Sequence, residues 1–190
     1  MPFFASDHEI MAFVDLRNSW VIAEQLVTAK TNYKMLTLHA GTAFASFLQS
    51  VQFPSHAVTL QVNDTKEVLG KGIQDFSILN QLITTGFTKG DALLLATDMR
   101  AMVNPTRMEA LFLLAEKLAA RILTCCHSCG APGFGFISTT ETLSCSLCNG
   151  PTPLHRFEIW GCVACENKEK KPRHDNRVQA EPNYCNYCNP

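Results

Sequence analysis

The chain has 190 residues, of which 46% are hydrophobic and 17% are charged. This composition is typical of a folded globular protein and excludes a disordered one. The formal net charge of −1 excludes a general electrostatic attraction to nucleic acid or to an acidic membrane surface, so such binding would need a local patch.

The start of the sequence has no signal-peptide pattern, because Met1–Phe4 is followed at once by the polar residues Asp7, His8 and Glu9. Wholly apolar stretches such as Ala92–Ala96 are far shorter than the roughly 20 residues that a membrane-spanning helix needs. Of the nine cysteines, eight form Cys-x-x-Cys pairs, which favour metal binding in a reducing compartment over disulfides. We therefore expect a soluble, cytoplasmic protein with no membrane partner.

Strand-like and helix-like segments alternate over the first two thirds of the chain. The short apolar or alternating pattern of β-strands occurs at Ile10–Leu16, Lys34–His39, His56–Val62 and Asp91–Asp98. The apolar spacing of helices occurs at Trp20–Ala29, Gly41–Val51 and Ile73–Thr85. This alternation predicts an α/β fold, with an α+β fold as the alternative, because strand order and direction cannot be read from the pattern.

The clearest predicted helix is Thr106–Thr124, which starts either with a capping box of Thr106 and Glu109 or at Asn104–Pro105. From Cys125 onward the chain is rich in Cys, Gly, Pro and Asn and has too few aliphatic residues for a core of its own. We therefore expect an α/β domain over residues 1–124 and a metal-stabilised module over residues 125–190.

Four Cys-x-x-Cys pairs dominate this second module. They are Cys126/Cys129, Cys145/Cys148, Cys162/Cys165 and Cys185/Cys188. Gaps of 15 residues between the first two pairs and 19 between the last two match the spacing of tetrathiolate zinc sites. The pattern predicts two structural Zn²⁺ ions in a zinc-ribbon-like module, in preference to an iron–sulfur cluster, a redox dithiol or disulfides.

The expected pairing of the motifs is first with second and third with fourth, because short loops close at the lowest entropic cost. An interleaved or nested pairing is the alternative. Phe134–Ile137 and Leu154–Trp160 have the pattern of short strands beside the motifs, and Asn149-Gly150 follows the second motif as a turn. His127 and His155 lie near the cysteines, but each site already has four sulfurs, so we expect neither to be a ligand.

A second candidate site lies in the segment Thr97–Met108. Asp98 and Arg100 follow a predicted strand, and Asn104 and Arg107 lie at the start of the long helix. Ligands of open α/β sheets bind at strand ends, and helix N-termini attract anions. The segment therefore predicts a site for a small anionic ligand, a phosphate or a carboxylate.

His56 and Lys71 precede a predicted strand and a predicted helix and are expected to face the same crevice. The alternative is structural: Asp98 forms an ion pair with Arg100 or Arg107, and Asn104 caps the helix. No P-loop, Gly-x-Gly-x-x-Gly, Gly-x-Ser-x-Gly or His-Glu-x-x-His motif is present in the sequence, so no reaction is indicated.

A different function class is binding of nucleic acid or a protein partner by the module. Between Cys165 and Cys185 the basic residues are Lys168, Lys170, Lys171, Arg173 and Arg177. Acidic neighbours offset them, and no aromatic residues are interleaved with them to stack on bases, so the pattern favours a solvated loop.

Several motifs together resemble a bacterial family catalogued as domain of unknown function 6671. They are FPSHA at Phe53–Ala57, KGI at Lys71–Ile73, TDMRAMVNPTRM at Thr97–Met108, CHSCGAPGFG at Cys126–Gly135 and CNYCNP at Cys185–Pro190. The resemblance covers nearly the whole chain and implies Asp98, Arg100, Asn104 and Arg107 as candidate site residues. It also supports the eight metal-binding cysteines but implies no reaction.

Members of that family carry a further N-terminal strand and a Thr-x-His-Gly-Lys-Glu-like turn ahead of the stretch that matches Phe3–Asp15. The resemblance therefore implies a copy that lacks this segment. A third functional expectation follows, which is a shortened copy without activity.

Overall fold

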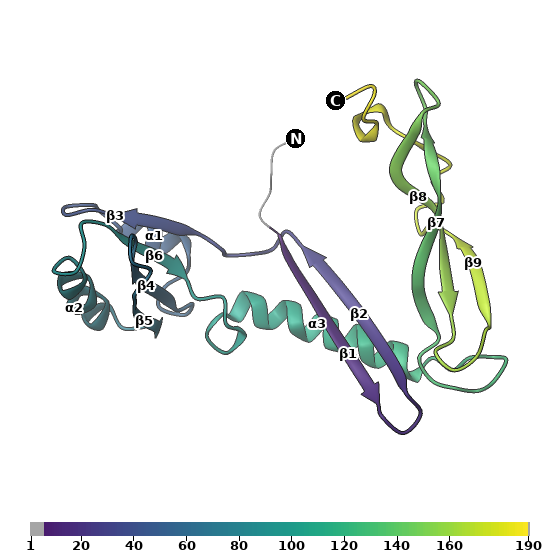
Figure 1. The fold of residues 1–190 in the computed structure, drawn as a ribbon, viewed down its shortest axis with the longest axis horizontal. Helices are drawn as coiled ribbons and strands as arrows, with labels where there is room; N and C mark the ends of the chain where they lie inside the picture. Colours follow the sequence, from purple (N-terminus) through teal and green to yellow (C-terminus); the bar gives the residue numbers. More distant parts are fainter. Residues whose placement is uncertain (1–5, 190) are drawn as a thin grey trace. The chain divides into compact units, whose positions relative to one another are not determined.

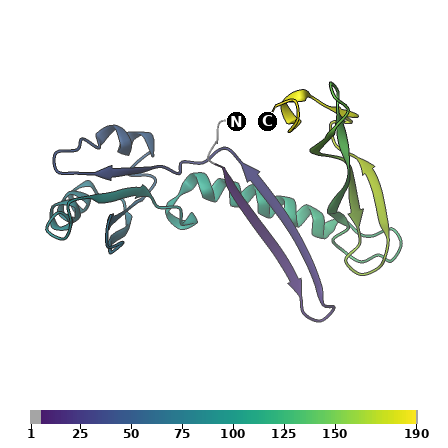
Figure 2. The ribbon, with the colours of Figure 1, turned by 45° about the horizontal axis from the view of Figure 1, so that its top comes forward.

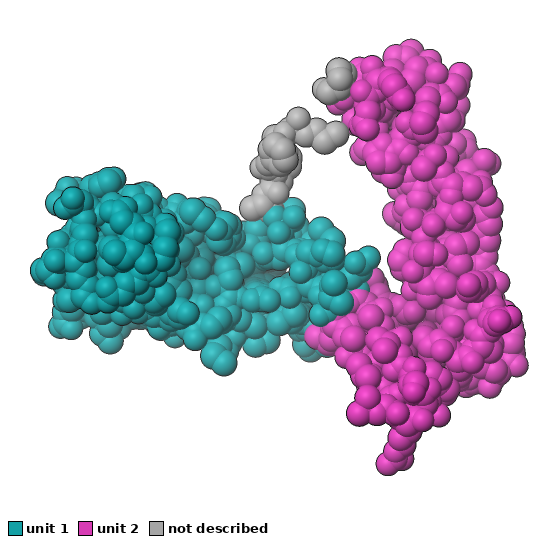
Figure 3. Space-filling model, in the orientation of Figure 1, with its two compact units in different colours: residues 1–10, 25–115 teal, residues 11–24, 116–190 magenta. Residues whose placement is uncertain are grey.

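The computed structural model describes residues 6–189. Residues 1–5 and 190, at the two ends of the expected domains, lie outside the described residues. The chain forms two compact units, one of residues 1–10 and 25–115 and one of residues 11–24 and 116–190 (Figure 3). The expected domain boundary, between residues 124 and 125, remains a prediction.

The first unit contains a four-stranded sheet in the order β3-β6-β4-β5 (Figure 1). Its strands are β3 at Met35–Leu38, β4 at Val58–Val62, β5 at Val68–Ile73 and β6 at Leu93–Thr97. Every neighbouring pair in this sheet is antiparallel. The expectation of mixed helices and strands is confirmed, and the antiparallel pairing favours the α+β description over a doubly wound α/β fold.

The core of this unit lies against one face of the sheet. Residues 58, 60 and 62 of β4 and residues 93, 95 and 97 of β6 are buried, while the residues between them are half-buried. Helices α1 at Ala45–Ser50 and α2 at Phe76–Gly86 add Phe47, Leu48 and Leu79 to the same cluster. This period-2 burial is the pattern from which β4 and β6 were predicted.

The predicted helix Trp20–Ala29 is wrong, because this segment is strand β2 at Trp20–Thr28. It forms a two-stranded sheet with β1 at Asp7–Asp15 (Figure 2). The turn decides the outcome: the Asp15 carboxylate accepts hydrogen bonds from the backbone of Arg17 at 2.9 Å and from the Asn18 side chain at 2.8 Å. Such Asp–Asn turns redirect the chain, and the Val and Ile residues that follow favour a strand.

The long helix is confirmed as α3 at Pro105–Leu123. Its start is Asn104–Pro105, because the Asn104 side chain accepts a hydrogen bond at 3.1 Å from the backbone N–H of Arg107. A short 3-10 turn, η1 at Ala101–Val103, precedes it. Among the helices of the described residues, none is both long and apolar enough to cross a membrane.

The second unit contains a sheet in the order β10-β7-β8-β9. Strands β7 at Gly135–Cys145 and β8 at Pro151–Gly161 form a long antiparallel hairpin (Figure 1), far longer than the short strands expected here. Strand β9 at Lys168–Pro172 is antiparallel to β8, and β10 at Gln179–Ala180 is parallel to β7. A last 3-10 turn, η2, covers Pro182–Tyr184.

The turn of the β7–β8 hairpin is built by Asn149-Gly150. Asn149 has a φ of 56° and donates its backbone N–H to the carbonyl of Cys145 at 2.9 Å. The Cys145 N–H in turn donates to the Gly150 carbonyl at 2.8 Å. Since Asn tolerates a left-handed conformation, this dipeptide closes the hairpin at the second cysteine motif.

Candidate metal centres

The eight cysteines of the four motifs lie in two groups of four that could each hold a metal ion. Within each group all sulfur atoms lie within 4.8 Å of one another. The first group is Cys126, Cys129, Cys162 and Cys165, and the second is Cys145, Cys148, Cys185 and Cys188.

Individual sulfur–sulfur distances fit a single tetrahedral ion. They are 3.8 Å for Cys126–Cys165 and 3.6 Å for Cys129–Cys162. In the second group they are 3.9 Å for Cys145–Cys188 and 3.5 Å for Cys148–Cys185. A tetrahedral site with metal–sulfur bonds of about 2.3 Å separates its sulfurs by about 3.8 Å, so the donor set suits Zn²⁺.

The expected consecutive pairing is wrong, because the first motif joins the third and the second joins the fourth. The first motif precedes β7 and the second ends it, so the 11 residues of that strand hold these two motifs apart. At a rise of about 3.3 Å per residue the separation is roughly 33 Å. A shorter loop saves only about 0.6 kcal/mol of closure free energy per twofold difference in length. This saving is too small to bend the extended strand so that its two ends meet.

Antiparallel pairing brings the correct motifs together. Gly135 at the start of β7 is opposite Gly161 at the end of β8, so the motifs before and after the hairpin meet at its open end. At the other end Ser144 is opposite Pro151, and the parallel pair Cys145–Ala180 brings the last motif to the turn. The hairpin therefore has one cysteine group at each end.

Backbone amides point at the sulfur atoms in both groups. The N–H of Ala164 lies 3.3 Å from Cys162 Sγ, and that of Leu147 lies 3.4 Å from Cys145 Sγ. At Gly130, which has a φ of 72°, the backbone N–H donates to the Cys126 carbonyl at 2.8 Å and closes the first turn. Amide donors stabilise the thiolate form, which is the form that binds metal.

Ionisation of the thiols is uneven within each group. Burial acts to raise the pKa of Cys126, but backbone hydrogen bonds from Ser128 and Cys129 outweigh it and lower the pKa to about 6. A backbone hydrogen bond from Cys148 lowers the pKa of Cys145 to about 7, whereas the neighbouring Cys148 thiol raises the pKa of Cys188 to about 12. Four thiolates this close repel one another, so full ionisation requires a bound cation.

The two nearby histidines lie against carboxylates. His127 Nε2 is 3.4 Å from a Glu169 oxygen, and His155 Nε2 is 3.9 Å from a Glu158 oxygen. Neither histidine belongs to the metal-binding groups found among residues 6–189. That the cysteines alone are the ligands remains a prediction.

In the strand-end cluster, Asp98 closes on Arg100. The Asp98 side chain is 3% exposed and accepts hydrogen bonds from Arg100 Nη2 at 2.6 Å and from the Gly72 backbone N–H at 2.8 Å. Burial acts to raise the pKa of Asp98, but hydrogen bonds from Arg100 and Gly72 outweigh it and lower the pKa. Gly72 has a φ of 67°, a backbone conformation that favours glycine, and a Cβ there would lie 3.0 Å from Arg100 Nη2.

Two other predicted ligand-binding residues organise the start of α3. Asn104 is fully buried and donates to Asn32 Oδ1 at 2.9 Å and to the Asp98 carbonyl at 3.1 Å. Arg107 donates through Nε to Glu9 Oε1 at 2.6 Å, and this hydrogen bond raises the pKa of Arg107. Because Glu9 lies 98 residues away in the sequence, no local pattern predicts this partner.

His56 and Lys71 differ in their surroundings. His56 is 3% exposed, and its Nε2 accepts the backbone N–H of Thr106 at 3.2 Å while its Nδ1 lies 3.0 Å from Ser55 Oγ. Burial lowers the pKa of His56, which favours the neutral ring that can accept this bond. Lys71 lies on β5 with an exposed side chain, next to the Gly72 that contacts Asp98.

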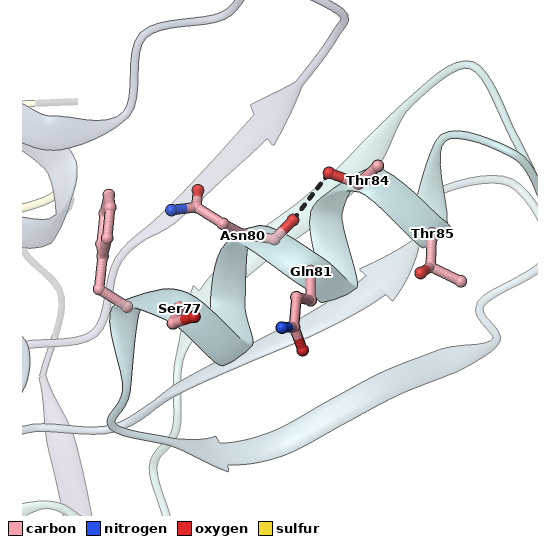
Figure 4. Close-up of a pocket in the computed structure, with 6 residues that line it drawn as sticks. Ser77, Asn80, Gln81, Thr84 and Thr85 are labelled. Atoms are coloured by element: carbon pink, nitrogen blue, oxygen red, sulfur yellow. Dashed lines mark hydrogen bonds between the residues drawn. The ribbon is translucent and has the colours of Figure 1, made fainter.

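A shallow hollow of about 620 Å³ lies elsewhere in this unit, on the outer face of α2 (Figure 4). Its lining includes Ser77, Asn80, Gln81 and Thr84, and the Thr84 hydroxyl donates to the Asn80 carbonyl at 3.0 Å. All of its lining side chains are uncharged, so the hollow offers no cation for an anionic ligand.

The basic segment after Cys165 contains strand β9 where a solvated loop was expected, and aromatic residues of β8 lie beside its lysines. Lys170 Nζ is 4.0 Å from the centre of the Phe157 ring, and Lys171 Nζ is 4.3 Å from that of Trp160. Cross-strand pairing supplies these contacts, which are invisible in the local sequence. Both lysines also form ion pairs, to Glu141 and Glu169, so their charge is compensated.

Comparison with known proteins identifies the family of this chain. The family described as "Domain of unknown function (DUF6671)" matches the chain over residues 1–190, which confirms the family resemblance. No curated protein and no solved structure matches the chain. The family description assigns no activity, so a functional conclusion depends on the geometry of the sites.

Proposed function

The chain belongs to the family described as a domain of unknown function, DUF6671, and we propose that it is a zinc protein with one structural Zn²⁺ in each cysteine group. The observation that carries this proposal is that four cysteine sulfurs lie within 4.8 Å of one another at each end of one hairpin. Four thiolates fill the coordination of Zn²⁺ and leave no open position for a substrate, so such sites fold the chain.

Zinc fits these groups better than an iron–sulfur cluster. Sulfurs that ligate a cluster must surround several metal ions and inorganic sulfides, whereas the four sulfurs of each group all lie within 4.8 Å of one another and leave room for a single ion. The role of the two ions is to fasten the ends of the β7–β8 hairpin, whose sequence has few aliphatic residues for a core.

Metal analysis of the purified full chain tests this function. We expect one zinc for each cysteine group, and loss of hairpin structure, followed by circular dichroism, when a chelator removes the metal. Cys125→Ser is the matched control, because Cys125 is exposed and lies outside both groups, and it should keep the full zinc content. An iron chromophore, or a chelated chain with unchanged structure, would contradict the proposal.

A second candidate function is binding of a phosphate or carboxylate at Arg100 and Lys71, as the sequence predicts. The observation that favours it is the position of Arg100. The buried Asp98 carboxylate holds its guanidinium, while the Arg100 side chain is 49% exposed. Its bonds to Asp98 go through Nε and Nη2, and Nη1 is the atom we assign to the anion. Arg107 is assigned a structural role, because its guanidinium binds Glu9 and the Met99 carbonyl.

Titration of the zinc-loaded chain with inorganic phosphate and nucleotides, followed by melting temperature, tests this second function. The shift should disappear in Arg100→Gln and weaken in Lys71→Gln, whereas the exposed Lys66→Gln in the same unit serves as the control. An equal shift in Arg100→Gln would remove the site from consideration. Nucleic acid or a protein partner at β9 is the less favoured proposal, because its lysines are paired with glutamates.

A further inference from the structure

A cavity of about 360 Å³ lies in the second unit, between the C-terminal half of α3 and the β7–β8 hairpin. Its volume is within the range of small-molecule sites in proteins. The residues that matter for recognition are Lys117, Arg121, Phe134, Phe136, Glu158 and Trp160. None of them is a cysteine ligand or belongs to the strand-end cluster, so this cavity is separate from both sites described above.

The cationic side of the cavity is compensated within the chain. Glu24 accepts from Lys117 Nζ at 2.9 Å and from Arg121 Nη1 at 3.1 Å, so one carboxylate serves two cations. Arg121 is further bound to the carbonyl of Ala23 at 2.7 Å and to that of Gly133 at 3.2 Å. Through these bonds the Arg121 guanidinium connects three segments of the chain. Donors of the guanidinium are used in these contacts, which does not favour an anionic ligand there.

The acidic side of the cavity is less well compensated. The Glu158 side chain is 18% exposed, and its Oε2 accepts a hydrogen bond at 3.0 Å from the neutral indole N–H of Trp160. Its ion-pair contact in the described part of the chain is to His155, at 3.9 Å, which is beyond hydrogen-bond distance. A bound cation stabilises a largely buried carboxylate more when the carboxylate's hydrogen-bond donor is neutral than when that donor is charged.

Aromatic rings beside this carboxylate complete a site for an ammonium group. Phe134, Phe136 and Trp160 line the same cavity, and the negative faces of aromatic rings attract organic cations. The chain's own Lys171 illustrates this affinity, since its ammonium lies 4.3 Å from the Trp160 ring centre and 5.9 Å from that of Phe134. We propose that this cavity binds a small organic ammonium ion with an apolar body, its nitrogen at Glu158 and its body against the aromatic wall.

Calorimetric titration of the zinc-loaded full chain with three matched probes tests the proposal. The probes are tryptamine, its neutral alcohol analogue tryptophol and the anion indole-3-propionate, at pH 8, where histidine side chains are generally uncharged. Tryptamine should bind at least tenfold more tightly than tryptophol, and the anion more weakly still. Equal binding of the amine and the alcohol, or no binding of the amine at millimolar concentration, would overturn the proposal.

Three variants locate the site. Glu158→Gln should weaken tryptamine binding at least tenfold, while Glu116→Gln, an exposed glutamate of α3 outside the cavity lining, should leave it unchanged. Lys171→Met removes a competing ammonium from the Trp160 ring and should strengthen binding several-fold. Binding that survives Glu158→Gln unchanged would overturn the assignment. Zinc content, measured on the same samples, separates failure of this site from failure of the proposed metal function.

Discussion

Replacement of Asp98 by alanine tests how this carboxylate stabilises the first unit. It does so either through its hydrogen bonds to backbone N–H groups or through its ion pair with Arg100 alone. The side chain accepts the Gly72 N–H at 2.8 Å, the Arg100 N–H at 3.0 Å and the Arg100 guanidinium at 2.6 Å. A partly buried N–H that loses its acceptor costs about 1–3 kcal/mol, whereas the guanidinium of Arg100 stays hydrated when unpaired. We therefore expect Asp98→Ala to lower the unfolding free energy of the first unit by about 2 kcal/mol.

Amide hydrogen exchange at Leu60 and Leu95 measures this free energy, because these paired core residues report on the sheet of the first unit alone. Arg100→Ala should cost much less than Asp98→Ala, since it leaves both backbone bonds to the carboxylate in place. Asp91→Ala, at an exposed position, is the control. If Arg100→Ala lowers the unfolding free energy as much as Asp98→Ala does, the backbone hydrogen bonds of Asp98 are not the stabilising contact. The ion pair would then be that contact.

Two further predictions concern the pH response of the first unit and the packing of the second. Burial lowers the pKa of His56 below its ordinary 6.5, so the unfolded chain binds this proton at a higher pH than the native chain. The contribution of His56 to the free energy of unfolding should therefore be fully present above pH 6.5 and be lost as the pH falls toward the lower native pKa. Urea unfolding followed by circular dichroism should show a smaller loss of this free energy with falling pH in His56→Gln. Gly133→Ala should destabilise the second unit by about 1–3 kcal/mol, because a Cβ there would lie 2.6 Å from Ile22 Cγ1. Gly130→Ala separates the steric contact from the backbone strain, since Gly130 has a similar positive φ with open space around it. Equal losses of unfolding free energy for the two variants in urea unfolding would exclude the steric explanation.

The predictability of the fold differed between segments for identifiable reasons. Strands β4 and β6 were predicted because alternate residues face a core, and this periodicity is a local property of the sequence. The segment Trp20–Thr28 was predicted wrongly, since its apolar spacing also fits a helix and the deciding feature is the Asp15–Asn18 turn before it. Strand β5 was missed, because its two glycines interrupt the apolar pattern.

The candidate sites were predictable in residue type but not in pairing. The Cys-x-x-Cys spacing identifies the eight cysteines, while their interleaving depends on the full length of β7, which only the Asn149-Gly150 turn hints at. At the strand end, Asp98 and Arg100 are two residues apart and their ion pair was an anticipated alternative. The bond from Arg107 to Glu9 was not predictable, because it forms between segments that are distant in the sequence.

Zinc content of two double variants tests the interleaved metal centres most directly. Cys126→Ser/Cys162→Ser removes two ligands from one group, so the chain should retain the zinc of the other group. Cys126→Ser/Cys145→Ser removes one ligand from each group and should leave both without tightly bound zinc. The reverse result, with zinc retained only when the first and second motifs are mutated together, would contradict the interleaved arrangement and restore the consecutive pairing.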